Sequence, residues 1–311
     1  TATMRADGSS KFGKNNKYGY FPSAAARWNI TNENFMKGNG ILSNLALRAS
    51  WGITGSQEYP SGAATAQFIF TQPNQAVQTV NANPDLKWEE TRSTNIGIDA
   101  NSKNGRIYGS IDYYHRNTTN IIFEGTAIQP ASSASLFRNI PANLINSGVE
   151  FGIGATVIEK TNLQWDVNFN IAYNKNKLTN FNEVGIITGQ INGQGVSGTL
   201  GQIITNGQPI NTYYLKPFSG FDAGGGQLVG DNPQFAGNSL PQTTYGFSTT
   251  VKYKKLSLAI NGGGAAGFKI FNNTATSVTN ISGIANGRNI DKNAYNSAEK
   301  TSSGAKASDR F

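Results

Sequence analysis

The stretch NPDLKWEETRSTNIGIDANSKNGRIYGSIDYYHR, residues 83–116, decides the fold, because it holds two alternating segments joined by a turn. Successive side chains of a β-strand point to opposite faces, so apolar residues at every second position indicate a strand with one apolar face. The apolar positions are Thr94, Ile96, Ile98 and Ala100 in the first segment and Ile107, Ile111 and Tyr113 in the second. Between the segments, Ser102–Gly105 contains Asn-Gly, which supplies the positive φ angles of a tight hairpin. The stretch therefore predicts a β-hairpin.

The same alternation recurs along the chain and predicts further strands. They cover residues 18–30, 44–54, 149–157, 163–174, 243–253 and 256–263, with the end of another strand before Asp7. With the hairpin, this gives eight complete strands and one partial strand. The prediction is an all-β, antiparallel protein.

The composition agrees with this fold class and excludes several others. Only 37% of the 311 residues are hydrophobic, whereas Gly accounts for 36 residues, Tyr for 12 and Phe for 17. No run approaches the roughly 18 apolar residues of a membrane-spanning helix, but a spanning β-strand needs only about 10 alternating residues. There is no cysteine, which excludes disulfides and thiolate metal sites. The net charge of +8 comes from scattered Lys and Arg, so we expect no nucleic-acid partner.

The connections between the expected strands alternate between short and long. The short ones lie near residues 31–43, 102–105, 159–162 and 254–255, and the long ones near 55–90, 117–146 and 175–242. In an up-and-down meander, all long connections then leave one edge of the sheet, as the outer loops of outer-membrane barrels do. We therefore expect an apolar face toward lipid (Ile98, Ile153, Phe169, Phe247) and a polar face toward the lumen (Asn95, Asp99, Asp166, Asn170). The alternative is a soluble or surface-exposed β-rich module that binds glycans or acts as an adhesin.

No enzyme signature is present, and we predict no catalytic residue. His115 is the only histidine, and the neighbouring carboxylates Glu89 and Glu90 would point to opposite faces of a strand. Residues 222–226 (DAGGG) with Asp231-Asn232 are similar in composition to calcium-binding loops but lack the required spacing. We therefore predict no metal site and no cofactor, with Ca²⁺ in the loops or in a partner as the alternative.

Aromatic residues in the long connections are the best candidates for solute binding. Rings stack on sugars and on peptide side chains, while Asn and Gln add hydrogen bonds. The residues nominated for this role are Trp88, Tyr213, Tyr214 and Phe218.

The chain resembles the barrel region of SusC/RagA-type TonB-dependent outer-membrane transporters. The resemblance covers nearly the whole chain, and NPDLKWEET followed by a hairpin ending in DYYHR is its most specific part. The similar segments are residues 5–13, 18–31, 47–57, 83–99, 111–122, 147–179 and 240–272.

The resemblance implies a transmembrane barrel of about 22 strands with long extracellular loops, of which residues 1–311 form a single partial domain. We expect the plug, the TonB-contacting segment, the signal peptide and the closing strands to lie outside this sequence. The implied function is import of glycans or (glyco)peptides across the outer membrane of a Gram-negative, Bacteroidetes-like cell. The implied partners are TonB, outer-membrane lipid, the solute and a SusD-like surface lipoprotein that acts as a lid.

Overall fold

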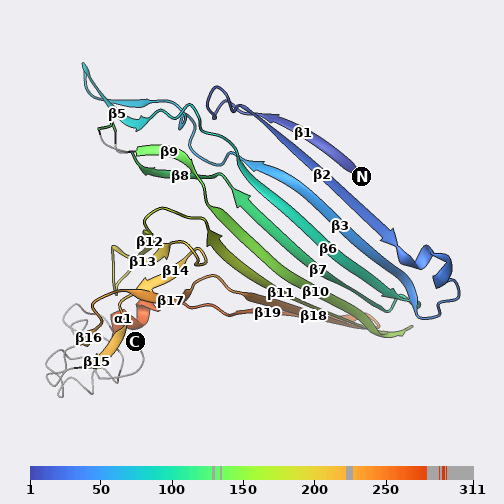
Figure 1. The fold of residues 1–311 in the computed structure, drawn as a ribbon. Helices are drawn as coiled ribbons and strands as arrows, with labels where there is room; N and C mark the ends of the chain where they lie inside the picture. The colour runs from blue at the N-terminus through green and yellow to red at the C-terminus, as the bar shows by residue number, and fades with distance from the viewer. Residues whose placement is uncertain are drawn as a thin grey trace. The chain divides into compact units, whose positions relative to one another are not determined.

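The computed structural model describes residues 1–127, 130–133, 135–221 and 227–278, together with residues 287, 289, 290 and 292 (Figure 1). The chain divides into two compact units. The first comprises Thr1–Asn182 and Gln242–Ala266, and the second Glu183–Pro241 and Gly267–Phe311.

The first unit is built on a nine-stranded antiparallel sheet with the order β1-β2-β3-β6-β7-β10-β11-β18-β19 (Figure 1). Its strands are β1 (Ala2–Gly8), β2 (Tyr18–Asn29), β3 (Leu42–Ser56), β6 (Glu89–Ser102), β7 (Ile107–Thr119), β10 (Asn143–Lys160), β11 (Leu163–Thr179), β18 (Thr243–Tyr253) and β19 (Leu256–Ala266). Every strand pairs with its neighbour in chain order among these nine, as in an up-and-down meander. The predicted all-β antiparallel fold is confirmed, and all nine expected strands are present.

The central hairpin forms where it was predicted, although its turn differs in detail. The Gly105 amide donates to the Ser102 carbonyl at 2.9 Å, and the Asn104 side chain accepts from the Ser102 hydroxyl at 2.8 Å. Only Gly105, with φ of 69°, has a positive φ in this turn. The prediction of positive φ at both residues of the Asn-Gly pair was therefore wrong. The Asn104 side chain caps the turn, while glycine alone adopts the left-handed conformation.

The long connections leave one end of the strands and the short connections leave the other end. The pairs Ser56↔Glu89, Glu90↔Thr119, Asn143↔Thr179 and Tyr173↔Thr243 place the ends that carry long connections together. We call this side of the sheet, where these strand ends lie, the loop edge. The connection 9–17 also leaves it, whereas the connections 30–41, 103–106, 161–162 and 254–255 leave the opposite, turn edge. The turn edge includes two short 3-10 helices, η1 (Ile30–Asn32) and η2 (Asn34–Met36).

The two faces of the sheet differ in polarity, as the alternation predicts. Ile153, Phe169 and Phe247 are direct partners on β10, β11 and β18 and therefore share one face. With Ile98 they are 40–49% exposed, so this apolar face is uncovered in the described part of the chain. One irregularity interrupts the pattern: a β-bulge between Thr156 and Ile158 displaces Val157 and places Ile158 opposite Trp165. The alternation in the sequence does not predict this bulge, which inserts one extra residue into β10.

The first two long connections fold into a second sheet. Its order is β4-β5-β9-β8, and its strands are β4 (Gln67–Gln72), β5 (Gln75–Asn81), β8 (Ile121–Thr126) and β9 (Ser135–Ile140). β5 and β9 pair in parallel through Val80↔Ser135 and Asn81↔Leu136. The connections 57–88 and 120–142 thus share a sheet.

The second unit contains the folded part of the third long connection. A four-stranded sheet has the order β12-β13-β14-β17, and β15 pairs with β16. The elements are β12 (Ile186–Ile191), β13 (Thr199–Ile204), β14 (Thr212–Leu215), β15 (Phe218–Phe221), β16 (Gln227–Val229), β17 (Gln234–Asn238) and α1 (Asn273–Val278). Among the described residues, no helix has the length and apolar character needed to cross a membrane. Residues 302–310 lie outside the described residues.

Candidate functional site

The four residues predicted to face a lumen lie on one face of the nine-stranded sheet. Asn95 and Asp99 on β6 pair with Tyr114 and Ser110 of β7, and the register continues across β10 to β11. There Asp166 and Asn170 occupy the same face, since Thr156↔Asp166 and Gly152↔Asn170 are direct partners. We call this the polar face. Whether it lines an interior stays a prediction.

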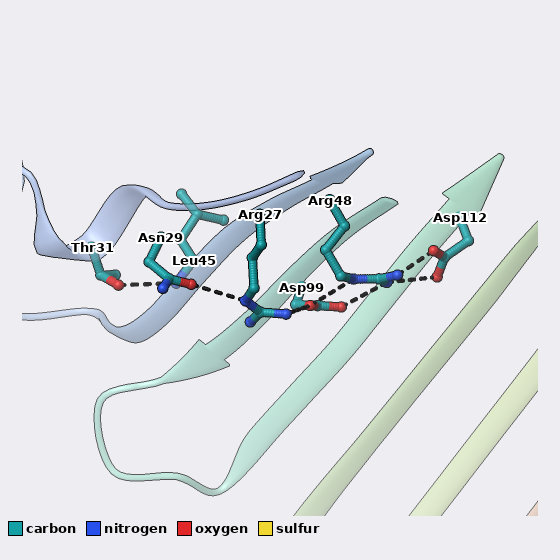
Figure 2. Close-up of polar contacts among 7 residues, drawn as sticks. All are labelled: Arg27, Asn29, Thr31, Leu45, Arg48, Asp99 and Asp112. Atoms are coloured by element: carbon teal, nitrogen blue, oxygen red, sulfur yellow. Dashed lines mark hydrogen bonds and ion pairs between the residues drawn. The ribbon is translucent and has the colours of Figure 1, made fainter. Parts of the chain in front are cut away.

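An ion-pair network crosses four strands of the polar face (Figure 2). The Arg48 guanidinium donates to both oxygens of Asp99, from Nε at 2.8 Å and from Nη2 at 2.9 Å. The same Nη2 also donates to Asp112 Oδ1 at 2.8 Å, while Arg27 Nη1 donates to Asp99 Oδ2 at 2.9 Å. The chain of charges therefore reads Arg27, Asp99, Arg48, Asp112, alternating in sign across β2, β6, β3 and β7. Each carboxylate is compensated by at least one guanidinium in a fixed geometry.

Gly97 allows the two halves of this network to meet. It pairs with Arg48 on one side and Asp112 on the other, so it lies between them on the same face. A Cβ atom at Gly97 would collide with Asp112 Oδ1 and would approach Arg48 Nη2 to 2.8 Å. A side chain at this position would therefore displace the Asp112 carboxylate and the Arg48 guanidinium from their present contact.

Two tyrosines of β7 reach across β10 to asparagines of β11. Tyr108 donates its hydroxyl to Asn168 Oδ1 at 2.8 Å, and Tyr114 donates to Asn174 Oδ1 at 2.9 Å. Each ring passes over a glycine of the intervening strand. Gly154 lies under Tyr108, and Gly148 lies under Tyr114. These bridges cover the polar face with oriented phenol and amide groups.

The polar face contains a hollow of about 510 Å³ toward the turn edge. Its polar lining includes Arg27, Asn44, Asp99, Asn101, Tyr108, Ser110, Asn168 and Asn170. Nearby, Asp166 accepts from the Thr156 hydroxyl at 2.8 Å and from Gln164 Nε2 at 2.8 Å. Amides, hydroxyls and paired charges suit a hydrophilic solute better than an apolar one.

Trp88, one of the nominated solute contacts, is only 6% exposed and lies in an aromatic cluster at the loop edge. Its ring lies 4.5 Å from the ring of Phe12 and 5.5 Å from that of Phe21, measured between centroids. Tyr59 completes the cluster at 5.3 Å from Phe12. Burial raises the pKa of the Tyr59 phenol to about 12. A direct contact between Trp88 and a solute stays a prediction, and in this conformation it would use a small part of the ring.

The other three nominated aromatics belong to the second unit. The Tyr213 hydroxyl accepts from the Phe271 amide at 3.2 Å, and the Tyr214 ring lies 5.6 Å from that of Phe235. Phe218 starts β15 and is 36% exposed. Tyr213 and Tyr214 point to opposite sides of β14, as neighbours on a strand do. Trp88 therefore lies in one compact unit and these three residues in the other.

The structure describes only part of the candidate calcium-binding loop. Within the described ranges, no group of three or more His, Asp or Glu side chains could hold a metal ion. Asp231-Asn232 lie between β16 and β17, whereas residues 222–226 lie outside the described residues.

Sequence reasoning did not nominate Arg27, Arg48, Asp112 or Tyr108, which form three members of the ion-pair network and one of the two tyrosine bridges. The available signal was the presence of charges at alternate positions within otherwise regular strands. A charge on a strand of a large sheet requires a partner on a neighbouring strand.

Comparison with protein families assigns this fold. A family model described as "TonB dependent receptor-like, beta-barrel" matches residues 1–273. The chain belongs to this family. The strand order, the separation of long from short connections and the two-faced sheet are thus those of a TonB-dependent receptor barrel, and the resemblance to SusC/RagA-type receptors is confirmed.

Two curated receptors illustrate the relationship. The chain is 39% identical over 191 residues to the TonB-dependent receptor SusC of Bacteroides thetaiotaomicron, covering 58% of this chain and 19% of the receptor. It is 29% identical over 308 residues to the TonB-dependent receptor P3 of Formosa agariphila, covering 88% of this chain and 31% of that receptor. The chain therefore spans less than a third of the length of these relatives. Both are named as receptors, not as enzymes.

Solved structures show the same fold. The RagAB peptide importer in its "open-open" state matches with a TM-score of 0.75 and 25% identity, over 86% of this chain and 30% of that chain. Its "closed-closed" state matches with a TM-score of 0.74 and 24% identity, over 90% and 33%.

Proposed function

We propose that this chain forms part of the wall of a TonB-dependent importer in the outer membrane. The observation that carries the proposal is that the nine-stranded sheet has one exposed apolar face and one hydrogen-bonded polar face. In a spanning barrel, apolar side chains contact lipid and polar side chains line the interior. A soluble adhesin or glycan-binding module would have to cover the exposed row Ile153, Phe169, Phe247, so this alternative is less favoured.

The polar face then forms part of the path of the solute. Asn95, Asp99, Asp166 and Asn170 line the interior, and the hollow beside Asp99 supplies amide and hydroxyl groups. The solute class is glycans or (glyco)peptides, because both carry many hydrogen-bonding groups and both stack on aromatic rings. A peptide solute is supported by the fold match to a protein described as a peptide importer.

Solute capture belongs to the loop edge. Tyr213, Tyr214 and Phe218 are the proposed direct aromatic contacts, and Trp88, the fourth nominated aromatic, is only 6% exposed and acts on the solute through the connections packed around it. Tyr213 and Tyr214 lie on a strand held in a sheet, so their rings are presented by ordered backbone. Aromatics on ordered loops lose little entropy on binding.

The proposed partners act on the two ends of this path. A SusD-like surface lipoprotein would cover the loop edge as a lid, and TonB would supply energy through a part of the transporter outside residues 1–311. The fold match to RagAB, whose states are described as open and closed, supports a lid that moves. No catalytic step and no cofactor is needed for this function.

Shortening the third long connection tests the proposal. In the full-length protein, residues 183–239 are replaced by a short Gly/Ser linker, which leaves β11 and β18 intact. We expect loss of the co-purified lipoprotein, loss of import of labelled oligopeptides or oligosaccharides, or both. A matched control lengthens the turn-edge connection at Lys254-Lys255 with the same linker and should leave both readouts unchanged. A shortened protein that holds its lipoprotein and imports at the normal rate would contradict the proposed role of this connection.

A further inference from the structure

The segment Asn83–Trp88 (NPDLKW) lies where three connections of the loop edge meet. It follows β5 and precedes β6, and Leu86 at its centre is fully buried. Two oxygens of Asn83 fix the turn that follows it. The side-chain Oδ1 accepts from the Asp85 amide at 3.1 Å, and the backbone carbonyl accepts from the Leu86 amide at 3.3 Å. The Asn83 amide donates to the Ala64 carbonyl at 3.1 Å, which fixes the segment to the preceding part of its own connection.

The connection 9–17 is attached to this segment by backbone and side-chain contacts. The Gly13 amide donates to the Leu86 carbonyl at 3.2 Å, and Asn16 Nδ2 donates to the Asp85 carbonyl at 3.1 Å. Gly13 packs so closely that a Cβ atom there would collide with the Pro84 carbonyl. Lys11 adds a second attachment, since its Nζ donates to the Tyr59 carbonyl at 3.0 Å.

The connection 120–142 is attached through one asparagine side chain. Asn139 Oδ1 accepts from the Lys87 amide at 3.0 Å, and Asn139 Nδ2 donates to the Lys87 carbonyl at 2.8 Å. The same Nδ2 donates to the Asn120 carbonyl at 2.8 Å. Asn83 contributes in return, with its Nδ2 donating to the Phe137 carbonyl at 2.7 Å. The Asn139 side chain thus bonds the Lys87 backbone as a neighbouring strand would, and it also bonds the residue that precedes β8.

The aromatic cluster seals this junction without using its polar atoms. Among the described residues, the Tyr59 hydroxyl and Trp88 Nε1 are buried and have no hydrogen-bond partner. A buried unpartnered donor is costly, so both rings are retained for their packing area and shape. Tyr59→Phe would keep the ring and remove only the unpaired hydroxyl, whereas Trp88→Phe would also reduce the volume of the packed ring.

We propose that Asn83–Trp88 is a positioning clasp, which holds the connections 9–17, 57–82 and 120–142 as one folded rim and thereby sets the shape of the solute entrance. The second part of this inference, that the rim sets the shape of a solute entrance, rests on the proposed import function. The clasp acts through the connections that it holds. Trp88 is accordingly a positioning residue, and it fills the space between Phe12 and Phe21.

The test uses the full-length transporter in detergent, with hydrogen–deuterium exchange as the first readout. Gly13→Ala detaches the connection 9–17, and Asn139→Ala removes the contacts to Lys87 and Asn120. Matched controls are Gly40→Ala, where a Cβ atom meets nothing within 4 Å, and Asn74→Ala in the exposed β4–β5 turn. We expect exchange in β4, β5, β8 and β9 to accelerate about tenfold in the first two variants and to stay unchanged in the controls and in β3, β6 and β10. Unchanged protection in both Gly13→Ala and Asn139→Ala would overturn the clasp.

The second readout separates positioning from direct contact and from barrel stability. Import of labelled oligopeptides and, in parallel, labelled oligosaccharides is measured over a range of concentrations. Asn139→Ala should raise the half-saturating concentration about tenfold with an unchanged maximal rate, and Tyr59→Phe, which keeps the packed ring, should resemble the wild type in both readouts. A Trp88→Phe protein with normal exchange but weakened solute binding would show direct contact and contradict the proposal. If the wild type imports neither probe, the proposed function fails, while the exchange measurement still decides whether the clasp exists.

Discussion

Tyr108 donates its hydroxyl hydrogen to Asn168 Oδ1 at 2.8 Å, and it reaches this acceptor by lying across Gly154 of the strand between them. The register places the three residues in one row, since Tyr108↔Gly154 and Gly154↔Asn168 are direct partners. The row is a polar crosslink over three strands that depends on the absence of a side chain in its middle. Glycine here serves the packing of its neighbours, and its φ is that of an ordinary strand.

A methyl group at Gly154 should therefore break the row. Its Cβ atom would collide with the Tyr108 ring and approach Asn168 Oδ1, so Gly154→Ala must displace the tyrosine. Overpacking of this kind costs about 1–3 kcal/mol. The measurement is the urea-dependent unfolding of the full-length protein.

The control is Gly152→Ala on the same strand and face, where the nearest atom to a new Cβ is Ser110 Oγ at 4.0 Å. This variant should unfold like the wild type. Equal effects of the two substitutions would show that the tyrosine row does not depend on Gly154.

Arg48 should contribute more to the free energy of unfolding than Arg27, the other guanidinium of the ion-pair network. It bonds both Asp99 and Asp112, whereas Arg27 reaches only Asp99. Arg48→Ala leaves two carboxylates without their shared guanidinium and should cost about 1–2 kcal/mol, a value reduced because the site is partly exposed to solvent. Arg48→Lys should recover only part of this loss, since an ammonium cannot bond both oxygens of Asp99 and one of Asp112 in the same plane.

Arg27→Ala is the matched comparison, because this side chain is more exposed and has one carboxylate contact. Its effect on unfolding should be less than half that of Arg48→Ala. A ranking in the opposite order would mean that the shared guanidinium is not the centre of the network.

Alkaline pH should loosen the loop edge through Tyr59. Burial raises the pKa of this phenol to about 12, against about 10 in an unfolded chain. Below pH 10 the phenol is neutral in both states, and its contribution to stability is fully present. Between pH 10 and 12 only the unfolded state ionises, so the contribution falls as pH rises and is lost above the folded pKa.

Exchange protection of β4 and β5 at pH 9 and pH 11, corrected for the intrinsic exchange rate, measures this effect. Tyr59→Phe removes the ionisable group and should show a smaller decline than the wild type. Identical declines would show that Tyr59 does not control the pH response.

The strands of the nine-stranded sheet could be predicted because each carries its information locally. In β11, Trp165, Phe169 and Tyr173 alternate with polar residues over positions 163–174, so the period is visible in the sequence alone. The strand continues to Thr179 through polar residues that show no alternation, so its full length is not. The separation of long from short connections follows from counting residues in a meander. The faces of Asn95 and Phe169 follow from the same alternation.

The loop-edge structure could not be predicted in the same way. β5 and β9 pair in parallel across more than fifty residues, and β4 reads QFIFTQ without clear alternation. The contact of Gly13 with Pro84 depends on the connection 9–17 folding back over a distant turn. Such contacts are set by the tertiary arrangement, and no periodic pattern in the sequence reports them. The bulge at Val157 was missed because a one-residue insertion leaves both flanking patterns intact.

A charge on the apolar face should be far more harmful than a charge beside it on the polar face. Phe169→Arg places a guanidinium in the row between Ile153 and Phe247 and should cost about 2–4 kcal/mol at the bilayer midplane. Asn170→Arg adds the same group to the polar face, where water and polar side chains accept it. The measurement is the amount of heat-resistant, folded transporter in the membrane, and equal amounts of the two variants would contradict the assignment of the faces.

The orientation of β11 is the most direct test of the whole account. Residues 1–311 contain no cysteine, so single cysteines can be placed in turn at positions 167–172 of the full-length protein and spin-labelled in lipid bilayers. Accessibility to oxygen, which concentrates in lipid, and to a water-soluble nickel chelate is then compared along the strand. We predict a period of two residues, with oxygen favoured at Val167, Phe169 and Ile171 and the chelate favoured at Asn168, Asn170 and Ala172. Uniform access of the chelate to all six positions would contradict a lipid-facing strand and, with it, the proposal that this chain is a wall of an outer-membrane importer.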